Sequence, residues 1–329
     1  MKLGLLTAAV GASLLLTSVA QAVELKISHV RPQGATIDVE VTELAAAVDK
    51  ATGGKVTMKV FAASALGNYT TVQERISVGA VDMACQPAAT GADRKMQISS
   101  FPYLAETWDQ ARKIYGPGGV VREEMTKLYA KQDITMLAAY PVYFGGISLN
   151  RDAVSPGDPN AKKGIKVRVP GIKSFQLTGQ ALGYIPSPIP FSEAFTAVQT
   201  GVVDGVIGSG AEGYYASFRD VTKSYIAANT HFEVWYLIIN SGKLAELGDA
   251  EKDALMKAAA EFEEKRWKTA EADQGKNEQK LADLGAKVVQ LSADELAASA
   301  KKVRAEVWPE ILKDVGEDWG NAILKKAQE

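Results

Sequence analysis

The stretch Val23–Phe61, VELKISHVRPQGATIDVEVTELAAAVDKATGGKVTMKVF, decides the fold of this chain. It opens at residues 23–29 with alternating apolar and polar side chains, a pattern that predicts a β-strand. Residues 37–51 then carry apolar side chains at helical spacing, and Gly53-Gly54 ends this predicted helix. A second alternating run at 55–61 predicts another strand. This order of elements predicts a parallel-rich sheet with helices on its faces.

The same rhythm continues through most of the chain. Residues 70–78 form a predicted helix that Gly79 ends, and residues 81–85 form a short apolar strand. Ligands of such folds lie beyond the carboxyl ends of strands, so the loops at 29–36 and 86–90 are candidate binding loops. Further strands are predicted at 135–140, 162–170, 202–207 and 232–240, and further helices at 107–131, 174–182, 192–200, 214–224, 249–284 and 292–315. No repeat and no low-complexity linker divides the chain, which favours two α/β lobes joined by several crossings.

The composition is typical of a globular protein and limits the available chemistry. The chain has 329 residues, of which 47% are hydrophobic, and this length suggests about two domains. Cys85 is the single cysteine, which excludes an intrachain disulfide and a cysteine-based zinc site. Only His29 and His231 could supply a histidine base. The 37 basic and 39 acidic residues are balanced and give no case for a nucleic-acid partner.

Residues 1–22 have the pattern of a secretory signal peptide. Lys2 supplies the positive start, residues 4–16 are apolar, and Ala20-Gln21-Ala22 is the small-x-small pattern that precedes cleavage. We expect cleavage after Ala22 and a periplasmic product. A membrane anchor is the alternative, but the apolar stretch is short and no charge cluster or second apolar helix follows it.

A glycine-rich motif, Gly208-Ser209-Gly210-Ala211-Glu212-Gly213, matches the G-x-G-x-x-G pattern between a predicted strand and a predicted helix. Backbone amides at such a helix start can hold a pyrophosphate. The motif alone is weak evidence for a dinucleotide site, and it lies late in the chain of an exported protein. The other interpretations are a flexible turn, or a loop whose backbone approaches a different bound anion.

Arg168 lies in the apolar run GIKVRVP at 164–170. A buried guanidinium needs a partner, because an unpaired buried charge is costly. Its planar shape matches a carboxylate through two parallel hydrogen bonds. That carboxylate belongs either to a ligand or to an Asp or Glu of the chain, and the pattern leaves both open. Two other side chains could be reactive. We expect His29 to be a strand-end histidine whose ring is hydrogen-bonded to backbone, and Cys85 to be a core residue.

The chain resembles one family in a specific central block. The block comprises residues 164–170, Ala181-Leu182-Gly183, Pro186–Phe191 with Glu193, and AVQTGVVDG at 197–205. It resembles the solute-binding proteins of tripartite ATP-independent periplasmic (TRAP) transporters. Supporting matches are Ala65-Leu66-Gly67, Gly79–Met83 and Phe101–Leu104, so the resemblance extends in order over essentially the whole mature chain.

The resemblance implies a two-lobed α/β periplasmic binding protein, class II-like, with interwoven lobes and a long lobe-spanning helix at 249–284. The expected lobes are 23–148 plus 238–278, and 149–237 plus 279–329. In this family the closed protein delivers its ligand, usually an organic acid, to a two-part membrane permease. The arginine that matches Arg168 grips the ligand carboxylate, and the residue that matches Phe191 lines the pocket.

Departures from the family pattern indicate a less polar pocket than that of sugar-acid members. A second pocket arginine of sialic-acid-type members falls near Gly145, and their asparagine falls at Gly208. We expect further polar contacts from Gln86, Thr90, Glu212 and His29, and aromatic walls from Tyr143, Phe144, Phe191, Tyr214 and Trp235. The loop at 208–213 would offer backbone amides or make room. These residues favour a carboxylate with an apolar or aromatic body.

We therefore expect a monomeric binding protein that has no catalytic residue, no cofactor and no metal ligand. Its expected partners are an organic acid and the TRAP permease. One alternative is an exported α/β enzyme that uses the loop at 208–213 for a phosphate-bearing cofactor. Another is a ligand-sensing partner of a membrane receptor.

Overall fold

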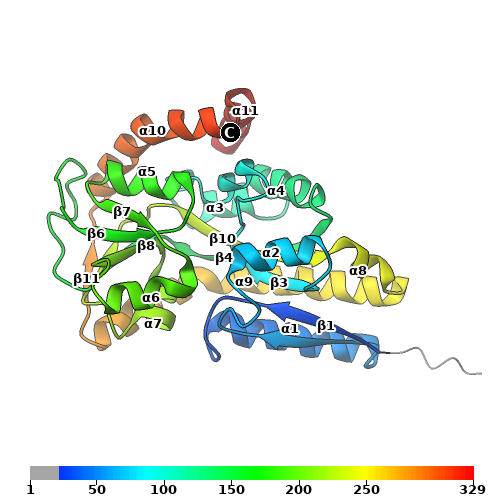
Figure 1. Ribbon diagram of the computed structural model, residues 1–329. Helices are drawn as coiled ribbons and strands as arrows, with labels where there is room; N and C mark the ends of the chain where they lie inside the picture. Colours follow the sequence, from blue (N-terminus) through cyan, green and yellow to red (C-terminus); the bar gives the residue numbers. More distant parts are fainter. Residues whose placement is uncertain (1–21) are drawn as a thin grey trace, which may run out of the picture.

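The computed structural model describes residues 22–329 and contains two β-sheets in separate lobes (Figure 1). The first sheet has the order β2-β1-β3-β10-β4 and comprises β1 (Val23–Ser28), β2 (Val56–Phe61), β3 (Met83–Gln86), β4 (Ile134–Phe144) and β10 (Phe232–Asn240). The second sheet has the order β11-β9-β5-β8-β6-β7 and comprises β5 (Gly146–Leu149), β6 (Lys166–Val169), β7 (Ile185–Pro188), β8 (Gly205–Ser209), β9 (Ser224–Ala227) and β11 (Lys287–Gln290).

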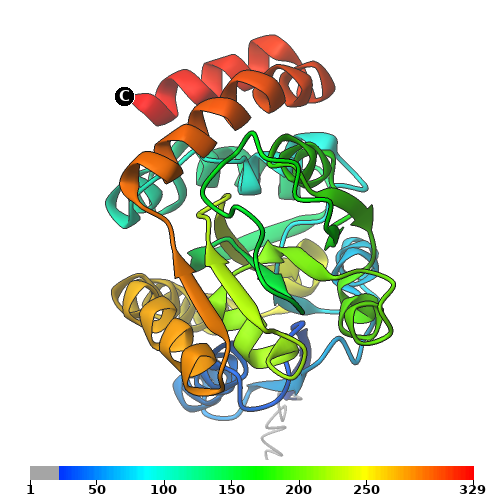
Figure 2. The same cartoon turned by 90° about the vertical axis from the view of Figure 1, so that its left-hand side faces the viewer.

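Helices surround both sheets, as the view along the second lobe shows (Figure 2). The helices are α1 (Thr36–Thr52), α2 (Tyr69–Ser77), α3 (Trp108–Tyr115), α4 (Val120–Ala130), α5 (Lys173–Ala181), α6 (Phe191–Gln199), α7 (Ala211–Phe218), α8 (Ser241–Glu246), α9 (Asp249–Asp283), α10 (Ala293–Val315), α11 (Glu317–Gln328) and the 3-10 helix η1 (Arg94–Ser100). The two-lobed α/β architecture and the long helix predicted at 249–284 are confirmed, and Ser292 caps α10 in a capping box with Glu295.

The first sheet is parallel only in part. β1 pairs in parallel with β2 and β3, whereas β10 is antiparallel to both β3 and β4. β10 enters this sheet from the second lobe, so its direction is set by the crossing and not by a strand–helix–strand unit. The predicted parallel-rich sheet is therefore correct for the first three strands and incomplete for the sheet as a whole.

Two neighbouring segments cross between the lobes and are hydrogen-bonded to each other. The N–H of Gly145, between β4 and β5, donates to the carbonyl of His231 at 2.8 Å, and the N–H of Thr230 donates to the carbonyl of Gly145 at 2.9 Å. A Cβ atom at Gly145 would lie 2.2 Å from Cε1 of His231. Position 145 therefore has no room for a side chain, and the crossing depends on glycine here.

Helix α9 is the third connection, and it covers the exposed edge of β4. Glu263 accepts from the N–H of Ala139 at 3.1 Å, Arg266 donates through Nε to the carbonyl of Pro141 at 2.9 Å, and Gln274 accepts from the N–H of Phe144 at 2.8 Å. Unpaired edge groups of a sheet are thus satisfied by helix side chains. The same helix also packs against α1 in the first lobe and against α7 and β11 in the second.

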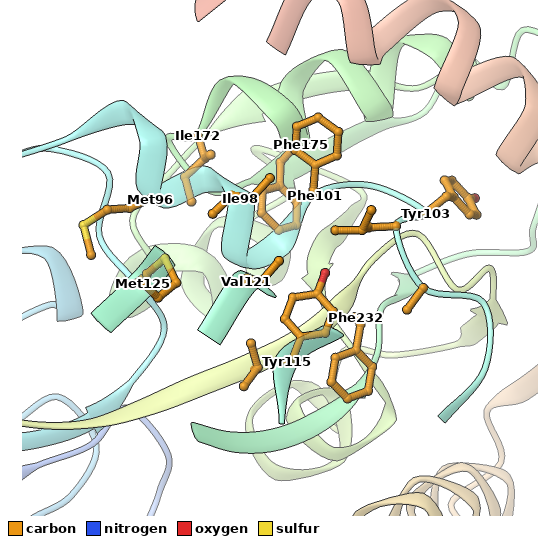
Figure 3. Packing of buried hydrophobic residues seen from close by; sticks show 14 of the residues in the cluster. Met96, Ile98, Phe101, Tyr103, Tyr115, Val121, Met125, Ile172, Phe175 and Phe232 are labelled. Carbon is orange, nitrogen blue, oxygen red and sulfur yellow. The ribbon is translucent and has the colours of Figure 1, made fainter. Parts of the chain in front are cut away.

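The larger hydrophobic core is continuous between the lobes. Figure 3 shows Ile172 and Phe175, at the start of α5, beside Ile98 and Phe101 of the η1 segment. Cys85 is fully buried in β3, and burial raises the pKa of its thiol well above the usual range. None of the helices among residues 22–329 is long and apolar enough to span a bilayer.

Several sequence predictions differ from the structure in their bounds. The predicted helix at 214–224 spans Ala211–Phe218, and the predicted strand at 162–170 is reduced to Lys166–Val169. The first twenty-one residues of the predicted signal peptide, residues 1–21, lie outside the described residues.

We predict that Glu263→Ala destabilises the protein by about 2 kcal/mol, because it leaves the buried N–H of Ala139 without an acceptor and the partly buried Arg122 without its acidic partner. Glu263 is 3% exposed and accepts from Nη2 of Arg122 at 2.8 Å as well as from Ala139. Glu264→Ala is the matched control, since Glu264 pairs with Arg112 in solvent and its loss should cost less than about 1 kcal/mol. Urea unfolding of both variants tests this, and equal losses would contradict the role assigned to Glu263.

Candidate binding site

A cavity lies between the two lobes, beside the carboxyl ends of several of their strands. The first lobe contributes the loop after β1, through Val30 and Arg31, and the loop after β3, through Pro87 and Ala88. These are the two loops that the sequence pattern indicated. Strand β10 adds three lining residues, Glu233, Val234 and Trp235. The second lobe contributes Arg168, Pro170, Ile172, Phe175, Phe191 and Gly208.

Arg168 is buried in this cavity with no acidic partner. It is 1% exposed, and its Nε donates to the carbonyl of Ile189 at 2.8 Å. Among residues 22–329, no carboxylate lies within 4.0 Å of its guanidinium, which excludes the internal ion pair left open by the sequence. Burial lowers the pKa of Arg168, because desolvation disfavours the charged form and acidic compensation is lacking. A guanidinium fixed by Nε and otherwise uncompensated is suited to receive an anion.

Arg31 is a second buried arginine in the lining, and it is already paired. Its Nη2 lies 2.9 Å from Oε2 of Glu212, its Nε donates to the same oxygen at 2.9 Å, and its Nη2 also donates to Ser209 at 3.3 Å. Glu212 raises the pKa of Arg31 against the opposing effect of burial. Because Arg31 follows β1 and Glu212 lies on α7, this ion pair joins the two lobes across the cavity.

Two aromatic rings lie against these cations. The guanidinium carbon of Arg31 is 5.1 Å from the ring centre of Phe191 and 4.8 Å from that of Trp235. The guanidinium carbon of Arg168 is 5.7 Å from the same Phe191 ring. Cation–π contacts of this kind hold the guanidinium groups in place while the rings present apolar surface to the cavity.

The glycine-rich motif is explained by close packing, not by a phosphate site. Cβ atoms at Gly208, Gly210 and Gly213 would lie 2.6 Å from Pro170, 2.5 Å from the Tyr143 ring and 2.4 Å from Nη2 of Arg31. Gly208 also has a positive φ of 102°, which favours glycine. The space at the start of α7 is therefore filled by protein side chains, which argues against the dinucleotide interpretation.

The structure brings five of the predicted site residues to the cavity, namely Arg168, Phe191, Tyr143, Gly208 and Trp235. Six others do not line it. His29 is fully buried beside Asp38, and burial lowers its pKa. The amide of Gln86 donates to the carbonyl of Tyr69, and the hydroxyl of Tyr214 lies within 2.9 Å of two backbone carbonyls. Phe144 packs against Trp108 and Phe232, Glu212 binds Arg31, and Thr90 lies outside the lining.

Sequence reasoning missed Arg31 and Glu233 as lining residues. Arg31 lies two residues after His29 in the predicted binding loop at 29–36. Which of the two side chains faces the cavity depends on the path of the chain after β1. Glu233 is the single acidic residue in the apolar strand Phe232–Asn240. A charge within an apolar strand is the same signal that indicated Arg168, and it would have identified Glu233. Among residues 22–329, no group of three or more His, Cys, Asp or Glu side chains could hold a metal ion.

The two lobes, the three crossings and the cavity between the lobes define a periplasmic-type binding-protein fold. The chain belongs to the bacterial extracellular solute-binding proteins, family 7, whose model matches residues 27–314. A related protein is the C4-dicarboxylate-binding periplasmic protein DctP of Rhodobacter capsulatus, 27% identical over 327 residues that cover 98% of this chain and 94% of the relative. A solute-binding protein of Roseobacter denitrificans is 26% identical over 74% of each chain.

Solved structures of TRAP solute-binding proteins share the fold. The sugar acid binding protein DctPAm of Advenella mimigardefordensis, in complex with galactonate, superposes with a TM-score of 0.86 at 20% identity, covering 94% of this chain and 98% of that one. DctP7 of Bordetella pertussis, which binds pyroglutamic acid, gives a TM-score of 0.82 at 23% identity, covering 94% and 100%.

We predict opposite effects of alanine at two helical glycines. Gly213→Ala should lower the free energy of unfolding by about 1–3 kcal/mol, because the new Cβ would lie 2.0 Å from Oγ of Ser209 and 2.4 Å from Nη2 of Arg31 and must displace both. Gly275→Ala in α9 has open space around it and should raise stability by up to about 1 kcal/mol through helix propensity. Denaturant unfolding measures both. A gain of stability in the Gly213 variant would contradict the tight packing of Arg31 against α7.

Proposed function

We propose that this protein captures a small organic acid in the cavity between its lobes and delivers it to a TRAP membrane permease. The observation that carries the proposal is the buried guanidinium of Arg168, which faces the cavity without an acidic partner. A ligand carboxylate would supply the missing negative charge through two parallel hydrogen bonds. No covalent step is needed, since the ligand is bound and released unaltered.

The surroundings of Arg168 favour a compact acid with an apolar or flat body. Ile172, Phe175, Phe191 and Trp235 form much of the wall. Several related proteins of known structure bind small carboxylic acids, including galactonate, pyroglutamic acid and orotic acid. Their shared chemical feature is the carboxylate, which is the group that Arg168 is suited to bind.

We interpret this arrangement of the lobes as the closed one, because the Arg31–Glu212 ion pair joins them beside the cavity. Arg31 and Glu212 contribute an inter-lobe contact that can form only on closure. A bound acid would favour closure because it also compensates Arg168, and only such differential contacts can shift an open–closed equilibrium. The closed form is then the one that the permease would recognise.

The remaining assignments follow from this role. We assign residues 23–144 and β10 to one lobe, and β5–β9 with β11 to the other, with α9 spanning both. Export to the periplasm with cleavage after Ala22 would place the protein beside a membrane permease. A ligand-sensing role with a membrane receptor would use the same site, and signalling that survives deletion of the permease would distinguish it.

We predict that Arg168→Met abolishes acid binding and leaves the fold intact. A thermal-shift screen with galactonate, pyroglutamate, orotate, succinate and aromatic acids identifies a binding acid, which at 100 times its Kd stabilises the protein by about 2.7 kcal/mol. Calorimetry then compares wild type, Arg168→Met and the control Arg151→Met, an exposed arginine of the same lobe. Unchanged affinity in Arg168→Met, or stabilisation by neutral sugars and by no acid, would contradict the proposal.

A further inference from the structure

Glu233 is a buried acidic residue in the wall of the same cavity. It lies on β10 and is 7% exposed. Its Oε1 accepts from Nε1 of Trp235 at 2.8 Å, and its Oε2 lies 3.0 Å from Nε2 of His231. A carboxylate has about four acceptor positions, so each oxygen keeps capacity for a further donor from the cavity.

The basic side chain hydrogen-bonded to Glu233 is His231. Nδ1 of His231 lies 3.0 Å from the hydroxyl of Thr230, which also lies 3.4 Å from the carbonyl of Gly145. We assign the protons so that Thr230 donates to Nδ1 and Nε2–H donates to Glu233, an arrangement in which the imidazole brings no positive charge to the carboxylate. Among residues 22–329, no lysine or arginine nitrogen lies within 4.0 Å of the Glu233 carboxylate.

With this assignment, two opposite charges face one cavity from different lobes, and among residues 22–329 neither is paired with a lysine, arginine, aspartate or glutamate side chain. Arg168 belongs to the second lobe, and Glu233 to the first. They do not pair with each other, since no contact between them is within 4.0 Å. The third and fourth charges nearby, Arg31 and Glu212, neutralise one another. Because buried charges need compensation, the cavity requires one negative and one positive group from its ligand.

We propose that the ligand is a zwitterionic acid, with a carboxylate for Arg168 and a protonated nitrogen for Glu233. This inference rests on the proposed function and specifies its substrate class. A simple carboxylate would compensate Arg168 but bring a second negative charge into a cavity that already holds Glu233. A zwitterion compensates both groups and adds no net charge, while Phe191, Phe175 and Trp235 contact its apolar body.

The alternative role of Glu233 is structural, in which it only orients Trp235 and His231. The two roles differ in their effect on ligand choice. If Glu233 binds the ligand, removal of its charge changes the preference between acids that differ only in a nitrogen. If Glu233 is structural, its removal weakens all acids alike. Glu233→Gln keeps the shape and one acceptor oxygen while removing the charge.

Matched ligand pairs test the proposal in the wild-type protein. The pairs are L-proline with cyclopentanecarboxylate, and L-phenylalanine with 3-phenylpropionate and 3-phenyllactate, within a screen of the common α-amino acids and N-methylated amino acids. We expect at least one amino acid to bind ten-fold or more tightly than its des-amino and hydroxy analogues. Equal or tighter binding of the analogues, or failure of every amino acid to bind, would overturn the proposal.

Variants separate this proposal from the proposed function. Glu233→Gln should reduce the preference for the amino acid at least ten-fold and leave the affinity for the des-amino acid unchanged or higher, with circular dichroism confirming the fold. Arg168→Met should abolish both. If binding depends on Arg168 but Glu233→Gln still prefers the amino acid over its des-amino analogue, the zwitterion assignment is wrong and the proposed function stands. If Arg168→Met binds every acid normally, the proposed function fails.

Discussion

The buried guanidinium of Arg168 is the constraint on which the rest of the structure depends. Strand β6 places it at the interface of the two lobes, where Nε is held by the carbonyl of Ile189 and no carboxylate is near. A charge of this kind costs several kcal/mol when water is removed and no counter-charge replaces it. Under the proposed function, closure of the lobes over an empty cavity would be unfavourable, and closure over a carboxylate would be favourable. The selectivity for acids and the conformational change would then have the same electrostatic cause.

The other features of the interface make closure reproducible. Arg31 and Glu212 form an ion pair that spans the lobes, and Phe191 lies against both cavity arginines. The crossings at Gly145 and Thr230 are hydrogen-bonded to each other. Helix α9 is bound to the edge of β4 by side chains and also reaches the second lobe. In the proposed opening and closing, these bonded crossings would hinge as one unit.

Much of this arrangement could be predicted from sequence, because it depends on local pattern. Period-two and helical runs gave β1, α1 and the long α9, and a charge within an apolar strand indicated Arg168. Strands β5, β7, β9 and β11 have four residues each, too few for a period to be recognised. Sequence alone could not show that Arg31, and not His29, lines the cavity, or that Glu212 binds Arg31 and not a ligand. Those side chains are directed by the packing of α7 against the loop after β1, which is a tertiary property.

The most direct test of the central claim is small-angle X-ray scattering of wild type and Arg168→Met, each with and without a binding acid. The account predicts an open, larger ligand-free wild type that contracts when the acid binds. We also predict that the acid no longer contracts Arg168→Met, because the guanidinium that would hold the carboxylate between the lobes is absent. A ligand-free wild type that already matches the closed structure and does not change on binding, or an Arg168→Met variant that contracts with the acid as the wild type does, would contradict this account.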